Sequence, residues 1–174
     1  MNEAPGLATA WAETELGRFF LGATDGGLAL LCLDEQRVDQ RLQAWARRPE
    51  SRAEVTERAR EWAVQAAREL DEYARGERSS FDVPLDLVGT EFQRAVWEAE
   101  RTIPFGSTRT YAQIAKAAGR PQAVRAVGQA TGANPIPIVV PCHRVLARQG
   151  LGGFTGGLAT KRRLLRHEGA LLFD

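Results

Sequence analysis

Three short apolar segments near the start of the chain, separated by glycine turns, constrain its fold more than any other feature. Gly17 separates LATAWAET (7–14) from RFFLGAT (18–24), and Asp25-Gly26-Gly27 precedes LALLCL (28–33). Glycine-rich turns between apolar segments are typical of hairpins, so residues 7–33 are expected to form an antiparallel β-meander.

Two helical segments are expected next, at Gln36–Arg47 and Arg52–Arg75, the second ending at Gly76. Residues 79–84 (SSFDVP) then break the helical pattern. We therefore expect an α/β domain at residues 1–83, a small antiparallel sheet plus helices, and a second domain at 84–174. A chain of 174 residues has room for two small domains.

The charge distribution is uneven, although the net charge is only +1. Residues 1–100 contain 12 Lys and Arg against 20 Asp and Glu, whereas residues 101–174 contain 11 against 2. A basic region favours a polyanionic partner such as nucleic acid. The alternative is that the acidic and basic halves simply dock on each other.

Several classes of protein are disfavoured. No apolar run approaches the roughly 20 residues that span a bilayer, and the N-terminus lacks the basic-then-apolar order of a signal peptide. Two cysteines are too few for a disulfide framework. We therefore expect a cytoplasmic protein with no membrane contact and no cofactor. We also expect no metal, because two Cys and two His barely suffice for one zinc site.

The second domain begins with helical signals. A helix is expected at Glu91–Arg101, and Thr110 with Gln113 forms a capping-box signature that opens another. That helix stops at Gly119, and a third runs from Pro121 to about Thr131. Two short helices joined by a tight glycine-containing turn have the form of a helix-turn-helix.

The last of these helices has a polar face rich in small residues. Ala123, Val127 and Ala130 face the core on a helical wheel. The opposite face contains Arg125 together with polar and small neighbours, namely Gln122, Gln129, Ala126 and Gly128. Such a face lets a DNA backbone approach closely while Arg125 reaches inward. An ordinary solvated helix face is the alternative.

One of the two cysteines lies beside one of the two histidines. Three prolines in NPIPIVVPCHRV (134–145) predict an extended apolar strand that leads to Cys142. A thiolate is a nucleophile, and an adjacent imidazole lowers its proton affinity. Because strand neighbours point to opposite sides, Cys142 and His143 need a turn or a bridging water to interact.

A carboxylate for this pair comes from the expected last helix, Leu158–Glu168. Glu168 lies on its inward stripe with Leu164 and Leu165, where a carboxylate needs a partner. Cys32, in an apolar segment, is expected to be a buried and inert thiol. His167 is expected at the surface.

These motifs resemble the O6-alkylguanine-DNA alkyltransferase family, the methylated-DNA–protein-cysteine methyltransferases. The resemblance lies in five ordered motifs: RAVGQA (125–130), NPIPIVV (134–140), PCHRV (141–145), GGL (156–158) and HEG (167–169). It covers residues 84–174 closely. It implies a ribonuclease H-like N-terminal domain and a mainly helical, winged-helix-like C-terminal domain that carries the helix-turn-helix.

The resemblance also implies roles. Cys142 accepts the alkyl group irreversibly from O6 of guanine, and more weakly from O4 of thymine. His143 takes the thiol proton through a water, and Glu168 holds the imidazole tautomer. Asn134 links the helix-turn-helix to the active-site segment, and Tyr111 hydrogen-bonds the N3 side of the purine.

The implied partner is double-stranded DNA containing O6-alkylguanine, bound in its minor groove by a protein that is monomeric in solution. Cooperative binding along DNA stays open. Arg125 replaces the flipped nucleotide, with Thr110, Gln122, Ala126, Gly128 and Gln129 also expected at the DNA. A mobile glycine-dense loop (151–157) forms one wall of the base pocket, and the pocket residues are Val140, Pro141, Phe154 and Thr155.

The sequence departs from the family pattern at two places. Phe154 stands where many relatives have a tyrosine, so leaving-group stabilisation depends more on Tyr111, with Thr155 as a helper. Some relatives bind zinc in the N-terminal domain, but here residues 1–83 contain no histidine and only Cys32. The alternatives are a non-catalytic damage-binding protein, a helix-turn-helix regulator with a structural Cys-His pair, and a cysteine hydrolase.

Overall fold

The computed structural model describes residues 4–171, and the chain divides into two compact units, Met1–Leu87 and Val88–Asp174. The expected domain boundary lies after residue 83. In the structure Pro84–Asp86 pairs with β3 of the first unit: Leu28 N donates to Pro84 O at 2.7 Å and Asp86 N donates to Leu28 O at 2.9 Å. The connecting segment therefore begins after these residues.

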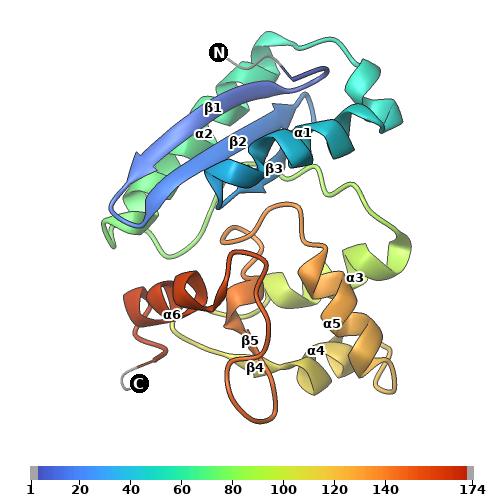
Figure 1. Cartoon of the computed structure of the whole chain (residues 1–174), viewed down its shortest axis with the longest axis vertical. Helices are drawn as coiled ribbons and strands as arrows, with labels where there is room; N and C mark the ends of the chain where they lie inside the picture. The colour runs from blue at the N-terminus through green and yellow to red at the C-terminus, as the bar shows by residue number, and fades with distance from the viewer. Residues whose placement is uncertain (1–3, 172–174) are drawn as a thin grey trace. The chain divides into compact units, whose positions relative to one another are not determined.

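The first unit contains the predicted meander, which is confirmed (Figure 1). β1 (Ala8–Thr14), β2 (Gly17–Thr24) and β3 (Gly27–Cys32) pair antiparallel in sequence order. The β2–β3 turn requires its glycine: Gly27 has φ +136°, and a Cβ there would lie 2.2 Å from the carbonyl oxygen of Pro84.

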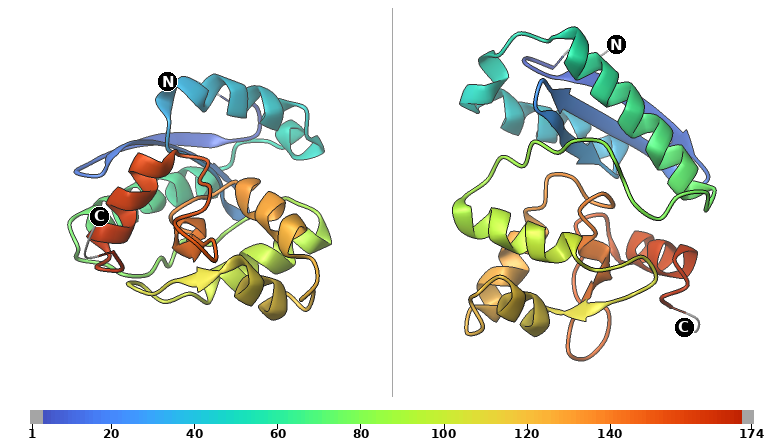
Figure 2. Two further views of the ribbon diagram at one scale, coloured as in Figure 1. Left: turned by 60° about the horizontal axis from the view of Figure 1, so that its bottom comes forward. Right: turned by 180° about the vertical axis from the view of Figure 1, so that it is seen from behind.

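Helix α2 (Glu57–Ala74) lies along one face of this sheet (Figure 2). Small side chains at the contact, Ala8 and Ala23 from the sheet and Ala59 and Ala63 from the helix, allow close packing. The predicted start of this helix at residue 52 is wrong. The Thr56 hydroxyl accepts a hydrogen bond from Ala59 N and begins the helix there.

The other predicted helix of this unit is confirmed in its body and shortened at its ends. It consists of a 3₁₀ turn, η1 (Glu35–Arg37), followed by α1 (Val38–Ala46). A second 3₁₀ turn, η2 (Pro49–Arg52), precedes α2.

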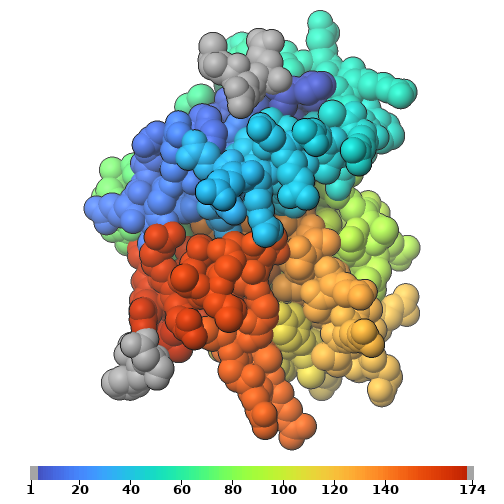
Figure 3. Space-filling view, viewed as in Figure 1, coloured from blue at the N-terminus to red at the C-terminus, as the bar shows by residue number. Residues whose placement is uncertain are grey.

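The second unit is mainly helical, as expected. Its elements in order are α3 (Glu91–Arg101), β4 (Arg109–Thr110), α4 (Tyr111–Ala117), α5 (Val124–Gly132), η3 (Cys142–Arg144), β5 (Val145–Leu146) and α6 (Leu158–His167). Helix α5 packs against both α3 and α4, and β4 pairs with β5 in parallel. The segment after β5 projects as a loop with an exposed tip at residues 148–150 (Figures 1 and 3).

The helix-turn-helix has the expected opening and a later second helix. Thr110 and Gln113 form the predicted capping box of α4, and Gly119 follows its end with φ +70°. The predicted start of α5 at Pro121 is wrong, because Ala123 N donates to Arg120 O at 2.9 Å and closes a turn around the proline. The helix begins at Val124.

Candidate active site

The segment that precedes Cys142 is a buried turn, so the predicted extended strand is wrong. Asn134 holds this turn with its side chain: Nδ2 donates to Val140 O at 2.8 Å, and Oδ1 accepts from Ile136 N at 2.9 Å. Ile138 has φ +75°, a conformation that strains a β-branched residue. The amide of Asn134 thus fixes a backbone that the prolines alone do not dictate.

Cys142 lies at the start of η3, which supplies the turn that the Cys-His pair requires. Its side chain is buried. Burial raises the pKa of the Cys142 thiol to about 12, and the charge of Glu100 acts in the same direction. A hydrogen bond with Asn134 and the ammonium of Lys161 lower it. The thiol is therefore protonated at neutral pH and needs a base.

His143 and Glu168 form the predicted pair, since Nε2 of His143 lies 2.8 Å from Oε1 of Glu168 and both side chains are fully buried. A carboxylate accepts hydrogen bonds, so Nε2 carries the proton and Nδ1 presents its lone pair. Nδ1 is buried with no protein partner among the described residues. Burial lowers the pKa of His143, with Glu168 opposing it. The imidazole is thus a neutral base.

Glu168 also binds Arg144, a contact that sequence reasoning missed. Arg144 Nε lies 2.8 Å from Oε2 and Nη2 lies 2.9 Å from Oε1 of the carboxylate. Arg144 Nη1 donates to Ile103 O at 2.6 Å, and Gly106 N donates to Glu168 Oε2 at 3.3 Å. One carboxylate therefore orients the imidazole and neutralises a buried guanidinium.

Two further buried charged side chains near the thiol were missed. Lys161 donates from Nζ to Val145 O at 2.6 Å and to Gly153 O at 3.1 Å, and burial lowers its pKa to about 8. Burial raises the pKa of Glu100 to about 7. Both residues lie on the buried stripes of their helices, so the helical-wheel argument that singled out Glu168 also applies to them.

The loop after β5 approaches the site through its glycines and Phe154. The Tyr111 ring leaves little room for a side chain at Gly152, where a Cβ would lie 3.1 Å from the ring. Burial raises the pKa of the half-buried Tyr111, and a nearby charge on Cys142 acts in the same direction. The Phe154 ring stands edge-on to His143 with centroids 6.5 Å apart. Thr155 donates to Gly132 O at 3.0 Å, which ties the loop to α5.

The remaining predicted site residues are distributed as follows. Val140 and Pro141 are buried beside Cys142. On α5 and the turn before it, Arg125, Gln122 and Gln129 are exposed, and Ala126 and Gly128 are partly exposed. Val127 and Ala130 are buried, as expected, whereas Ala123, which was expected on the same core face, is partly exposed. The Thr110 hydroxyl accepts from Gln113 N as the cap of α4.

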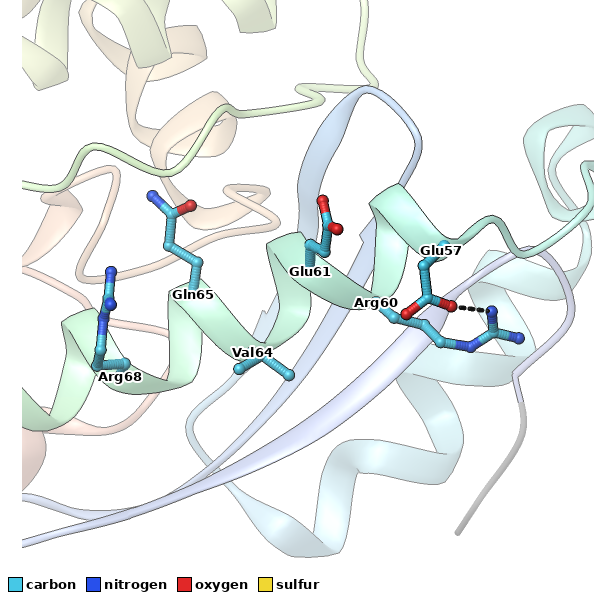
Figure 4. A pocket seen from close by; sticks show the side chains of 6 residues that line it. All are labelled: Glu57, Arg60, Glu61, Val64, Gln65 and Arg68. Atoms are coloured by element: carbon cyan, nitrogen blue, oxygen red, sulfur yellow. Dashed lines mark hydrogen bonds and ion pairs between the residues drawn. The ribbon is translucent and has the colours of Figure 1, made fainter.

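Outside this site, the first unit has a surface depression lined by α2 alone (Figure 4). Its charged side chains have both signs, and Arg60 pairs with Glu57 at 3.0 Å, as on an ordinary solvated helix face. Cys32 is buried as expected, with Sγ 3.2 Å from Asp34 O. His167, expected at the surface, is partly exposed and stands edge-on to the Phe105 ring.

Within residues 4–171, no three His, Cys, Asp or Glu side chains are grouped so that they would hold a metal ion. None of the helices in that range is long and apolar enough to cross a membrane.

Comparison with known proteins identifies relatives across most of the chain. Residues 91–170 match the family model of the 6-O-methylguanine DNA methyltransferase DNA-binding domain. A methylated-DNA–protein-cysteine methyltransferase of Mycolicibacterium paratuberculosis is 42% identical over 169 residues, covering 93% of this chain and 96% of the relative. An inducible enzyme of the same name from Bacillus subtilis is 41% identical over 151 residues, covering 84% and 82%.

Solved structures give the same result. The O6-methylguanine methyltransferase of Mycobacterium tuberculosis superposes with a TM-score of 0.74 at 38% identity, covering 94% of this chain and 93% of that one. A structure of the M. tuberculosis protein OGT in complex with DNA has a TM-score of 0.74 at 39% identity, covering 92% and 91%. This chain belongs to the methylated-DNA–protein-cysteine methyltransferase family.

Proposed function

We propose that this protein repairs alkylated DNA by direct reversal, moving the alkyl group from O6 of guanine, and more weakly from O4 of thymine, to the sulfur of Cys142. The observation that carries the proposal is the buried Glu168–His143 pair: His143 is next to Cys142 in the chain, and its Nδ1 has no hydrogen-bond partner within residues 4–171. Membership of the family supports the same chemistry.

His143 acts as the base in this scheme. Nδ1 takes the thiol proton of Cys142 through a water, and Glu168 stabilises the imidazolium that forms. A sulfur–carbon bond forms at the alkyl carbon as the carbon–O6 bond breaks, and the bonding electrons leave with guanine. Tyr111 hydrogen-bonds the N3 side of the departing base. The thioether has no easy leaving route, so each molecule reacts once.

The surface of α5 serves DNA binding. The target oxygen is inaccessible in a stacked duplex, so the nucleotide must be extruded at a cost of a few kcal/mol. Arg125, exposed on α5, fills the gap that it leaves, and the small Ala126 and Gly128 let the helix enter the minor groove. Thr110, Gln122 and Gln129 contact the flanking DNA.

The flipped base enters a pocket beside Cys142. Val140 and Pro141 supply apolar surface for the alkyl group, and Phe154 forms part of the loop wall. Because the Thr155 hydroxyl is engaged with Gly132, Tyr111 is the main polar contact to the leaving base. The partner is double-stranded DNA with an O6-alkylguanine, bound by a monomer.

Intact-protein mass spectrometry after mixing with a duplex containing one O6-methylguanine tests the proposal. We expect a gain of one methylene per protein, mapped to Cys142 by peptide analysis, with Cys32 unmodified as the internal control. The Cys142→Ala variant should gain nothing. Tight lesion binding without a mass gain would instead identify a damage-binding protein, and repeated turnover on an ester or amide would identify a hydrolase. Sequence-specific binding of undamaged DNA without a gain would identify a regulator.

Replacing Arg125 with alanine should slow repair in duplex DNA more than transfer from the free base O6-benzylguanine. Arg125 is needed only when a nucleotide must be held out of the stack, and the free base requires no extrusion. Single-turnover rates on both substrates measure the difference. The control is Arg162→Ala, which removes an exposed arginine of α6. Equal losses on both substrates would rule out a role of Arg125 in flipping.

A further inference from the structure

Glu100 is a buried acid that the proposed reaction does not use. It lies near the end of α3, a helix that packs against α5 and η3, and it is 0% exposed. Its Oε1 accepts a hydrogen bond from the Thr131 hydroxyl at 2.6 Å. Its Oε2 is buried without a hydrogen-bond partner in the described part of the chain. If Glu100 is ionised, only one of its two carboxylate oxygens accepts a hydrogen bond, so burying its charge costs free energy.

Helix α3 packs against η3, which carries Cys142, and the charge of Glu100 acts on titratable groups of three other elements. They are Cys142 of η3, Tyr111 of α4 and Lys161 of α6. A negative charge on Glu100 raises the pKa of Cys142 and supports the ammonium of Lys161. Burial brings the pKa of Glu100 itself to about 7, so the acid and the anion are both populated near neutral pH.

We propose that Glu100 is a positioning residue whose ionisation opposes formation of the Cys142 thiolate, so that the nucleophile is most available while Glu100 is a neutral acid. This inference rests on the proposed alkyl transfer. The anion and the thiolate repel each other in a buried environment where charges are poorly screened. The ammonium of Lys161 has the opposite effect and lowers the pKa of Cys142. Its Nζ is held in place by hydrogen bonds to two backbone carbonyls.

The test compares wild-type protein with Glu100→Gln from pH 5.5 to 7.5, a range that includes the pKa of Glu100 at about 7 and stays below that of Lys161, about 8 in the wild-type protein. Two rates are measured: reaction of Cys142 with a small aromatic disulfide, and methyl transfer from duplex DNA. The Cys142→Ser variant corrects the first for Cys32. The ratio of variant to wild type should be near one at pH 5.5 and rise to at most about fourfold at pH 7.5, where about a quarter of the wild-type molecules still hold Glu100 as the neutral acid.

A second variant separates the charge from packing. Thr131→Val removes the hydrogen bond that lowers the pKa of Glu100, so the midpoint of the pH profile should move upward. The control Glu69→Gln alters a buried acid of the other unit, whose oxygens accept from Gln65, Asp82 and Val83. It should leave the profile unchanged.

Profiles of Glu100→Gln and wild type that stay parallel at all pH values would overturn the inference, because a purely structural role changes the rate by a constant factor. The disulfide reaction needs no DNA. Suppose that wild-type protein accepts no methyl group, but the ratio of disulfide reaction rates, Glu100→Gln over wild type, still rises with pH. The proposed function is then wrong, whereas the role of Glu100 is supported.

Discussion

Replacing Glu168 with alanine is expected to lower the free energy of unfolding by about 3–5 kcal/mol, because it leaves the guanidinium of Arg144 buried and unpaired. Arg144 has a side chain only 6% exposed and cannot shed its charge. His143 loses its Nε2 acceptor in the same change. Urea denaturation followed by tryptophan fluorescence measures the loss.

The matched control is Glu98→Ala, which breaks an exposed pair with Arg101 at 2.9 Å. Exposed pairs contribute at most about 1 kcal/mol. A double variant, Arg144→Leu with Glu168→Leu, removes both buried charges and should recover part of the stability lost by Glu168→Ala. A loss for Glu168→Ala no larger than that of Glu98→Ala would show that the buried cluster is not a stabilising element.

Replacing His143 with glutamine is expected to slow alkyl transfer by roughly 10²–10⁴-fold, the usual contribution of a positioned base. With the pKa of Cys142 raised to about 12, roughly one thiol in 10⁵ is ionised at pH 7 without help. Glutamine keeps a polar group that can face Glu168 but has no basic nitrogen. Single-turnover transfer from an O6-methylguanine duplex measures the rate.

The other histidine provides the control for this prediction. His167 lies at the end of α6 against the Phe105 ring, and His167→Gln should transfer at the wild-type rate. Burial lowers the pKa of His143, so the base stays neutral below pH 6.5 and wild-type transfer should persist there. Equal rates for His143→Gln and wild type would contradict its role as the base.

The sequence by itself determined the elements whose signals are local. The glycine turns that set the meander, the Thr110–Gln113 capping box and the inward stripe with Leu164 and Glu168 each act within a few residues. The Cys142–His143 motif is also contiguous, and its resemblance to a family gave the chemistry. Such features arise from turn conformation and from the spacing of apolar residues along a helix, and both depend on residues that are close together in the sequence.

Other features were decided only by contacts between distant residues. The segment before Cys142 forms a turn and not a strand because the Asn134 amide bridges Ile136 and Val140. Glu168 meets Arg144 as well as His143 because α6 packs against η3. Burial also sets the charge states of the site, since it raises the pKa of Glu100 and lowers that of Lys161. The helical stripes of Glu100 and Lys161 are local patterns that indicate burial, but the partners of these side chains and the extent of their desolvation depend on the packed fold.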